Sequence, residues 1–262
     1  MNDEIEKKII EAIPKLQDKL NILHFSTGVD SVVSYLRLKE FGIKPILIYK
    51  YFLPDIPMVM NYIDWFERKY NERVYLIPNT LFYQHIDNAL YQFPIYGRED
   101  FRNNLTPFLF YKEFRKKSVD KKILKAIGLK KEDVVFHVGV RYTDGLLRYL
   151  SIQKNGVWNK DNTFFPIASF KVNDLKEMLD KYECKLPIEY KLFGISFESL
   201  RSWNIGLIRQ ECPASYEYML QFFPMVKLLE YRDKFNTLNK HFKIRVTQFK
   251  DYAIDKSLYD VW

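Results

Sequence analysis

The stretch that decides the fold runs from Asn21 to Gly42 and reads NILHFSTGVDSVVSYLRLKEFG. It opens with a short apolar run at 22–25, which predicts a buried strand, and continues into the polar turn STGVDS at 26–31. The residues after the turn carry apolar side chains at the spacing of one helical face, and Gly42 predicts the end of that helix. Strand, hydroxyl-rich turn and helix together suit an anion, because the first turn of a helix offers unpaired N–H groups and a positive dipole end.

The turn also has a purely structural interpretation. It can be an ordinary connection between a strand and a helix, in which Asp30 or Ser31 caps the helix. It is not a Walker A loop, because it has no lysine and too few residues between the glycine and the hydroxyl. The turn alone leaves both interpretations open.

The turn resembles the S-G-G-x-D-S pyrophosphate loop of the PP-loop, or N-type, ATP pyrophosphatases. Within that superfamily it is most similar to the phosphoadenosine phosphosulfate (PAPS) reductase-like family, with Thr27 where the family pattern has its second glycine. The resemblance implies that phosphate oxygens are held by four residues of the loop: Ser26, Thr27, Gly28 and Ser31. It also implies that Asp30 contributes to nucleotide binding and catalysis, by holding Mg²⁺ or orienting the loop.

A second segment, GVRYTDGLLR at 139–148, is similar to the family segment G-[IV]-R-x-x-[ED]-S-x-x-R. The match keeps Gly139, Arg141, Asp144 and Arg148. A guanidinium can bind phosphate oxygens bidentately, so we expect Arg141 and Arg148 to neutralise pyrophosphate or a second anionic substrate, with Gly139 also at the nucleotide. The structural alternative is an Arg–Asp pair that only closes the end of a strand.

Two further segments bear on the resemblance. The family holds adenine and ribose at the ends of its first two strands, which implies that Tyr49, in the apolar run PILIY at 45–49, contacts the nucleotide. The segment at 166–175 is similar to the family's P-[LI]-x-x-W-x-x-x-[DE]-[VIL], with Phe170 in place of tryptophan, and supports the fold rather than the chemistry.

The cysteines distinguish between activities. Cys184 and Cys212 are the only two, so one chain cannot supply a four-cysteine iron–sulfur cluster. Cys212 precedes a proline, as in the family's C-x-x-C-P loop, but Arg209 replaces the first cysteine, and the Cys-Gly-x-His tail of the assimilatory reductases is missing. These features weigh against sulfonucleotide reduction, and Cys212 is interpreted as a small buried hydrophobe more readily than as a nucleophile.

Composition limits the class of protein. The 262 residues are 47% hydrophobic, which indicates a folded chain, and no apolar run approaches the ~20 residues that span a bilayer. The N-terminus has no signal-peptide core and cysteines are few, so we expect a cytoplasmic protein that does not contact membranes. A net charge of +8 fits an anionic ligand and permits nucleic-acid contact, and the four histidines lack the spacing of a zinc site.

These patterns predict an α/β protein with a single doubly wound domain and a mainly parallel sheet, similar to the adenine nucleotide alpha hydrolase-like (Rossmann-like) fold. We expect an N-terminal helix in residues 1–20, a nucleotide-binding domain at 21–235 and a helical extension at 236–262. The strands are expected at 22–25, 45–49, 73–77 and 134–141, with another at 244–246, and ordered structure is expected to resume at 163–167 after the polar stretch that follows Tyr142. Helices are expected at 3–20, 32–42, 57–70, 80–117, 119–127, 171–182 and from 213 onward.

Three functions follow from the resemblance. The first is an ATP-dependent, AMP-forming transferase that releases pyrophosphate and activates an unidentified acceptor, either a nucleic acid or a small molecule. The second is a PAPS or adenylyl-sulfate reductase-like oxidoreductase, and the third is a non-catalytic module that binds a nucleotide or a partner. A homodimer is left open, and heavy use of Lys, Phe, Tyr, Ile and Asn suggests an AT-rich genome such as that of a phage or a low-GC bacterium.

Overall fold

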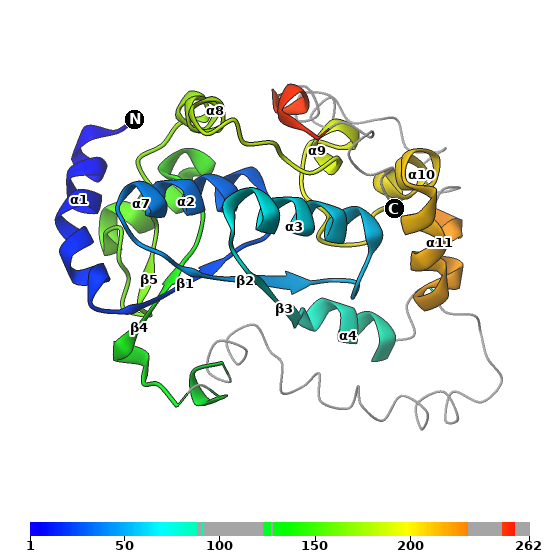
Figure 1. Cartoon of the computed structure of the whole chain (residues 1–262), viewed down its shortest axis with the longest axis horizontal. Coiled ribbons are helices and arrows are strands. Elements are labelled where there is room, and N and C mark those ends of the chain that lie inside the picture. Colours follow the sequence, from blue (N-terminus) through cyan, green and yellow to red (C-terminus); the bar gives the residue numbers. More distant parts are fainter. Residues whose placement is uncertain (88–90, 92–122, 127, 230–247, 255–262) are drawn as a thin grey trace. The chain divides into compact units, whose positions relative to one another are not determined.

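The structure, a computed structural model, describes residues 1–87, 91, 123–126, 128–229 and 248–254 (Figure 1). Its strands are β1 (Leu20–His24), β2 (Ile46–Tyr51), β3 (Val74–Pro78), β4 (Val134–His137) and β5 (Thr163–Phe164). Its α-helices among these residues are α1 (Asp3–Gln17), α2 (Val29–Glu40), α3 (Pro57–Tyr70), α4 (Thr80–Asp87), α7 (Leu146–Asn155), α8 (Val172–Lys181), α9 (Glu189–Leu192), α10 (Ser202–Glu211) and α11 (Pro213–Phe222). Short 3-10 helices cover Lys131–Asp133, Tyr142–Asp144, Pro224–Lys227 and Lys250–Tyr252. The predicted strand at 244–246, most of the helix predicted at 119–127 and the region 92–117 lie outside the described residues.

The strands form one parallel sheet in the order β3-β2-β1-β4-β5. Ile22 on β1 pairs with Ile46 on β2 and with Phe136 on β4, so β1 occupies the middle of the sheet. The predictions of an α/β protein and of a parallel sheet are confirmed. Within the described residues, no helix is long and apolar enough to cross a membrane.

The strand predicted at 134–141 is shorter in the structure and ends at His137. The N–H of Val140 donates to the carbonyl of Val138 (2.9 Å), which turns the chain out of the hydrogen-bonded ladder. Residues 138–144 therefore leave the sheet as a connection beyond the carboxyl end of β4.

The chain forms two compact units that alternate along the sequence. The first comprises Met1–Lys50, Glu67–Leu76 and Lys121–Leu186, and the second comprises Tyr51–Phe66, Ile77–Asp120 and Pro187–Trp262. The first unit contains β1, β4, β5, most of β2 and β3, and helices α1, α2, α7 and α8. The domain boundaries expected from the sequence at residues 20 and 235 stay a prediction.

Helix α2 is buried on nearly every side rather than along the single face that its spacing predicts. Its buried residues are Val29, Ser31, Val32, Val33, Ser34, Tyr35, Leu36 and Leu38. Its N-cap is Gly28 and no side chain caps it, so the interpretation of Asp30 or Ser31 as the cap is wrong. The predicted stop is confirmed: the helix ends before Gly42, which has a φ of +71° that glycine adopts without strain.

Helix α1 packs on the first unit through Ile5, Ile9 and Leu16, which are at most 1% exposed. Its N-cap is Asn2, whose Oδ1 accepts the N–H of Ile5 (3.1 Å). The amide oxygen thereby satisfies one of the N–H groups that the first turn of a helix leaves unpaired.

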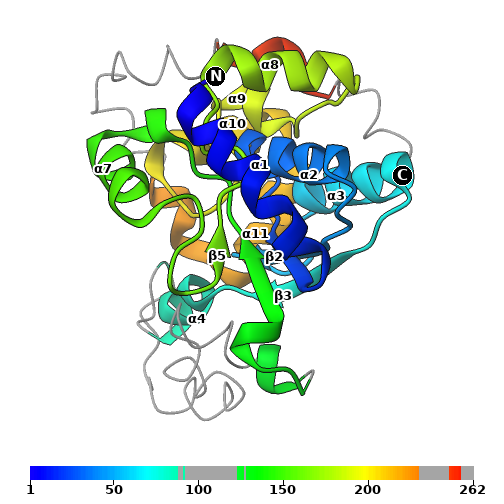
Figure 2. The ribbon, with the colours of Figure 1, turned by 90° about the vertical axis from the view of Figure 1, so that its left-hand side faces the viewer.

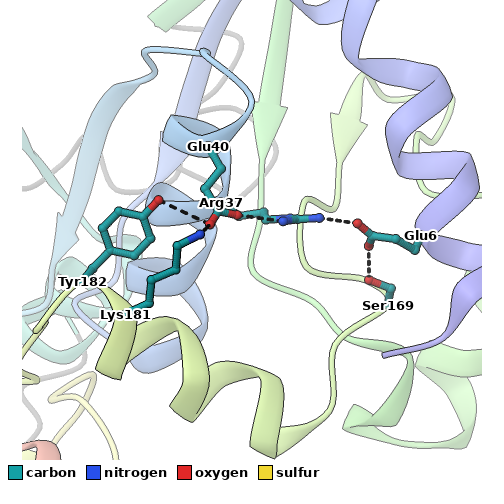
Figure 3. Close-up of polar contacts among 6 residues, drawn as sticks. All are labelled: Glu6, Arg37, Glu40, Ser169, Lys181 and Tyr182. Atoms are coloured by element: carbon teal, nitrogen blue, oxygen red, sulfur yellow. Dashed lines mark hydrogen bonds and ion pairs between the residues drawn. The ribbon is translucent and has the colours of Figure 1, made fainter.

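A polar network centred on Arg37 joins α1, α2 and the end of α8 (Figure 3). The guanidinium of Arg37 contacts Glu6 and, at 2.7 Å, Glu40, and its side chain is 17% exposed. Glu6 also accepts the hydroxyl of Ser169 (2.6 Å), while Glu40 is paired with Lys181. Because Glu6 and Glu40 are both less than 15% exposed, the guanidinium compensates two largely buried carboxylates.

The second unit has a core rich in aromatic rings. Phe52 stacks on Phe223 with 6.0 Å between ring centroids, and the N–H of Met58 donates to Ser215 Oγ (2.9 Å). Glu189 is fully buried, and neither of its carboxyl oxygens has a hydrogen-bond partner among the described residues. Burial raises the pKa of Glu189 to about 8, against a smaller lowering by nearby backbone N–H groups, so this side chain favours the protonated form in the folded state.

Candidate functional site

The candidate site lies where the chain leaves β1 and β4, and all of its parts belong to the first unit. These strands are adjacent and parallel, so their carboxyl ends meet at one edge of the sheet. The chain continues from β1 through α2 to β2 on one side, whereas β4 and β5 lie on the other. This is a topological switch point, the position at which open α/β sheets bind their ligands. The structure thus brings the loop 26–31 to the same edge as the connection 138–144.

The loop 26–31 is closed by its own hydroxyl groups. Ser31 Oγ donates to the carbonyl of Gly28 (2.8 Å) and accepts both the N–H (3.1 Å) and the hydroxyl (3.2 Å) of Ser26. A serine hydroxyl has one hydrogen and two lone pairs, so these three bonds saturate Ser31. Its role in the structure is to fix the shape of the loop, whereas Ser26 is exposed.

Thr27 is 1% exposed, and its hydroxyl donates to the carbonyl of Ser26 (2.6 Å). Its φ is +59°, a left-handed conformation that is costly for a β-branched residue. This is the position at which the pattern that the loop resembles has glycine, the residue that adopts positive φ without strain. The backbone of the loop therefore keeps the shape that glycine favours, at the expense of strain in Thr27.

Position 139 requires glycine because the connection 138–144 passes very close to the backbone of Asp30 in the loop 26–31. A Cβ atom at Gly139 would lie 2.6 Å from both the carbonyl carbon and the carbonyl oxygen of Asp30, and 2.9 Å from its Cβ. The same carbonyl oxygen accepts the hydroxyl of Ser34 (2.7 Å), which further fixes the backbone of Asp30. Gly139, predicted to lie at the nucleotide, acts here through packing: it lets the first turn of α2 contact the chain that leaves β4.

Arg141 lies between two carboxylates. Its Nη2 is 2.8 Å from Asp144 Oδ1, and its backbone N–H donates to Asp144 Oδ2 (2.8 Å). Its Nε lies 2.9 Å from Asp30 Oδ1. The Arg–Asp pair that the sequence left as an alternative is thus present, and the structure adds Asp30, from 111 positions earlier in the chain, as a second partner.

The two ion pairs of Arg141, with Asp144 and with Asp30, differ in hydrogen-bond geometry. Asp30 Oδ1 is close to Arg141 Nε but makes no hydrogen bond with it, because the alignment is poor. Arg141 Nε and Nη1 are both buried and have no hydrogen-bond partner among the described residues. Buried donors without partners are costly, so this guanidinium retains two donors that suit the oxygens of an anion.

The surroundings of Asp30 have opposing effects on the pKa of its carboxyl group. Burial raises the pKa of Asp30 to about 6, the guanidinium of Arg141 opposes this increase, and the carboxylate of Asp144 adds to it. The side chain as a whole is still 34% exposed, although its Oδ1 is buried.

The remaining predicted site residues lie in different surroundings. Tyr49 on β2 is 4% exposed, so its ring is packed within the protein and presents little surface to a base. Arg148 is exposed in the first half of α7, which lies to the left of β5 in Figure 2. Leu146 and Leu147 of the same helix are 71% and 82% exposed.

A buried pair beneath the site was not predicted from the sequence. His137, the last residue of β4, contacts Asn21 of β1 through Nε2 and Oδ1 (2.8 Å). Asn21 Nδ2 donates to the carbonyls of Leu16 and Lys19, so its Oδ1 is the acceptor for a hydrogen on His137 Nε2. Burial lowers the pKa of His137 to about 3, so the neutral ring joins the two strands and carries no charge. One isolated histidine in an apolar run gave no signal for this pairing.

The described residues do not fit a protein-built metal centre. None of them form a group of three or more His, Cys, Asp or Glu side chains that could hold a metal ion. Asp30 contacts the guanidinium of Arg141, and its assignment as a Mg²⁺ ligand stays a prediction. The two free cysteines also lack the setting of a catalytic pair: Cys184 is buried and its pKa is raised to about 11 by burial, and Cys212 is partly exposed between α10 and α11.

No protein-family model matches the sequence, and no curated protein matches it. The functional argument therefore depends on the arrangement of the loop 26–31, Gly139 and Arg141 at the edge of the sheet.

Proposed function

We propose that this protein is a PP-loop, PAPS reductase-like enzyme that binds an adenine nucleotide by its phosphates at the carboxyl ends of β1 and β4. The observation that carries the proposal is Arg141, a largely buried guanidinium next to the uncapped start of α2. Its Nε and Nη1 make no hydrogen bond among the described residues, although Nε lies 2.9 Å from Asp30 Oδ1. A guanidinium and a helix N-terminus both bind phosphate oxygens well. Their meeting at a topological switch point supports a phosphate site rather than an ordinary turn.

The proposed reaction is the AMP-forming activation of an acceptor by ATP. An oxygen of the acceptor attacks the α-phosphorus, the bond between the α-phosphorus and the bridging oxygen breaks, and pyrophosphate leaves with that oxygen. Such a reaction depends on position and on stabilisation of charge, so it needs no nucleophile from the protein. Arg141 is proposed to bind the phosphates that become pyrophosphate, and the exposed Arg148 to meet a second anionic group.

The acceptor is proposed to be a nucleic acid or a small molecule, which the net charge of +8 permits. Mg²⁺ would have to arrive with the nucleotide, because the described residues do not form a metal site of their own. No step of the proposal is assigned to Mg²⁺.

Sulfonucleotide reduction is the weaker alternative. It needs a reactive thiolate, and the pKa of the buried Cys184 is raised to about 11. Full activity of a Cys212→Ala variant would exclude this alternative.

Titration calorimetry with ATP, PAPS and adenylyl sulfate tests the proposal. We expect wild-type protein to bind ATP, and Arg141→Gln to bind it about 10- to 150-fold more weakly, as for loss of a charge-assisted hydrogen-bond pair worth about 1.5–3 kcal/mol. Arg73→Gln is the matched control, because Arg73 is 75% exposed and its nearest carboxylate, Glu67, is 3.5 Å away. If no nucleotide binds, or if Arg141→Gln binds as well as wild type, the phosphate site is wrong.

Binding and catalysis are separated by a second assay. Release of pyrophosphate from ATP, alone and with tRNA, DNA or small acceptors, would support the enzyme. Tight binding of ATP without pyrophosphate release under any of these conditions would support the third function, a non-catalytic nucleotide-binding module.

A further inference from the structure

We infer that Asp30 is an intramolecular competitor for the phosphate site: its carboxylate takes the place of a ligand oxygen beside Arg141 and has to turn away when phosphate binds. The inference rests on the proposed phosphate site and adds a means by which the protein sets its affinity. It follows from three features of the first unit.

The first feature is charge. Arg141 carries one positive charge and contacts two carboxylates, Asp30 and Asp144, so the three side chains together do not form an attractive site for a polyanion. Two anions near one guanidinium leave no net attraction for a third. Displacement of one carboxylate restores the positive charge that a phosphate needs.

The second feature is the difference between the two carboxylates. Asp144 accepts the backbone N–H of Arg141 and contacts Nη2, both at 2.8 Å, so it holds the backbone and one end of the guanidinium. Asp30 is 2.9 Å from Nε but makes no hydrogen bond there. Asp144 is therefore the positioning residue, and Asp30 is the partner that is easier to displace.

The third feature is the limited freedom of Asp30. Its backbone is fixed by contact with Gly139 and by the hydroxyl of Ser34, so it cannot retreat as a whole. Its side chain is 34% exposed, which leaves a rotation toward solvent open to it. Release of Arg141 thus requires a change of one rotamer and no movement of α2.

Inorganic pyrophosphate, titrated into the full chain by calorimetry without divalent cations, tests this inference. We expect Asp30→Asn to bind pyrophosphate about tenfold more tightly than wild type, because the variant keeps the shape of the side chain and removes the competing charge. Asp161→Asn is the matched control, since it makes the same change in net charge at a carboxylate that is 67% exposed and pairs with Lys131. Asp161→Asn should bind as wild type does.

Other outcomes separate the two proposals. If wild type binds pyrophosphate and Asp30→Asn binds it equally or more weakly, the competitor role is wrong while the phosphate site stands. If neither protein binds, the proposed phosphate site fails and the inference fails with it. Asp30→Ser, compared by the same titration after its thermal unfolding is shown to match wild type, provides a second variant should Asp30→Asn not fold.

Discussion

Substitution of Gly139 by alanine should push the connection 138–144 away from the loop 26–31, the two segments that form the site. The added Cβ would meet the carbonyl carbon and oxygen of Asp30 at 2.6 Å, whereas carbon atoms in contact usually lie about 3.5–4.0 Å apart. The atoms in the way are backbone atoms of the first turn of α2, so no flexible side chain can move aside. The backbones would have to part by about 1 Å.

The expected cost follows from this contact. Overpacking of a well-packed region usually lowers the free energy of unfolding by about 1–3 kcal/mol. Replacement of glycine by alanine raises it by about 0.4–1 kcal/mol, because alanine has fewer conformations in the unfolded chain. We therefore expect Gly139→Ala to lower the free energy of unfolding by about 1–2 kcal/mol. Gly139 is not in the left-handed region, so the loss would come from the contact and not from an unsuitable backbone conformation.

Urea unfolding followed by circular dichroism measures this loss. The matched control is Gly206→Ala within α10, where a Cβ would meet nothing within 4 Å, and this variant should equal or exceed wild type in stability. Because Asp30 would shift relative to Arg141, Gly139→Ala should also change the affinity for pyrophosphate. A Gly139→Ala protein as stable as wild type, with unchanged affinity, would refute the close approach as the reason for this glycine.

Three further predictions concern stability. Between pH 4.5 and 8 the unfolded chain loses the proton of Glu189 while the folded chain keeps it, so the free energy of unfolding of wild type should fall as the pH rises through this window. Glu189→Gln should remove this pH dependence. In urea unfolding at pH 8, its free energy of unfolding should exceed that of wild type by on the order of 2–5 kcal/mol. Arg37→Ala removes the guanidinium that pairs with two largely buried carboxylates, Glu6 and Glu40, and leaves Glu40 with Lys181, so it should cost about 3–5 kcal/mol. Lys181→Ala, at a 61% exposed lysine, should cost less than about 1 kcal/mol, and equal losses in thermal unfolding would contradict the central place of Arg37. Ser31→Ala removes three hydrogen bonds of the loop and should lower the free energy of unfolding by about 1–3 kcal/mol, a larger loss than for Ser26→Ala. A larger loss for Ser26→Ala than for Ser31→Ala would argue against a structural role for Ser31.

The proposed phosphate site and the proposed competition by Asp30 both depend on one side chain, Asp30, in two rotamers. With Asp30 beside it, Arg141 is stabilised within the protein; with Asp30 turned to solvent, Nε and Nη1 are available to a ligand. The cost of displacing Asp30 would lower the apparent affinity, and the size of this cost is what the Asp30→Asn titration measures.

Much of the fold was determined by the sequence itself. The stretch Asn21–Gly42 predicts β1, the turn and α2, because apolar spacing over a few residues reports secondary structure directly. The apolar runs at 45–49 and 134–141 predict β2 and β4, although β4 ends at His137 and Arg141 lies in the connection that follows it. A parallel sheet then brings the ends of its strands to one edge, so the location of the candidate site also follows from the sequence.

What each residue does at that edge was decided by tertiary structure alone. Asp30 and Arg141 are 111 positions apart, and nothing in either local pattern shows that they meet. The need for glycine at position 139 depends on a backbone from another segment, and the burial of Tyr49 depends on what covers β2. The physical reason is range: periodicity and capping act over a few residues of one segment, whereas close approach, burial and ion pairing arise only when distant segments pack together.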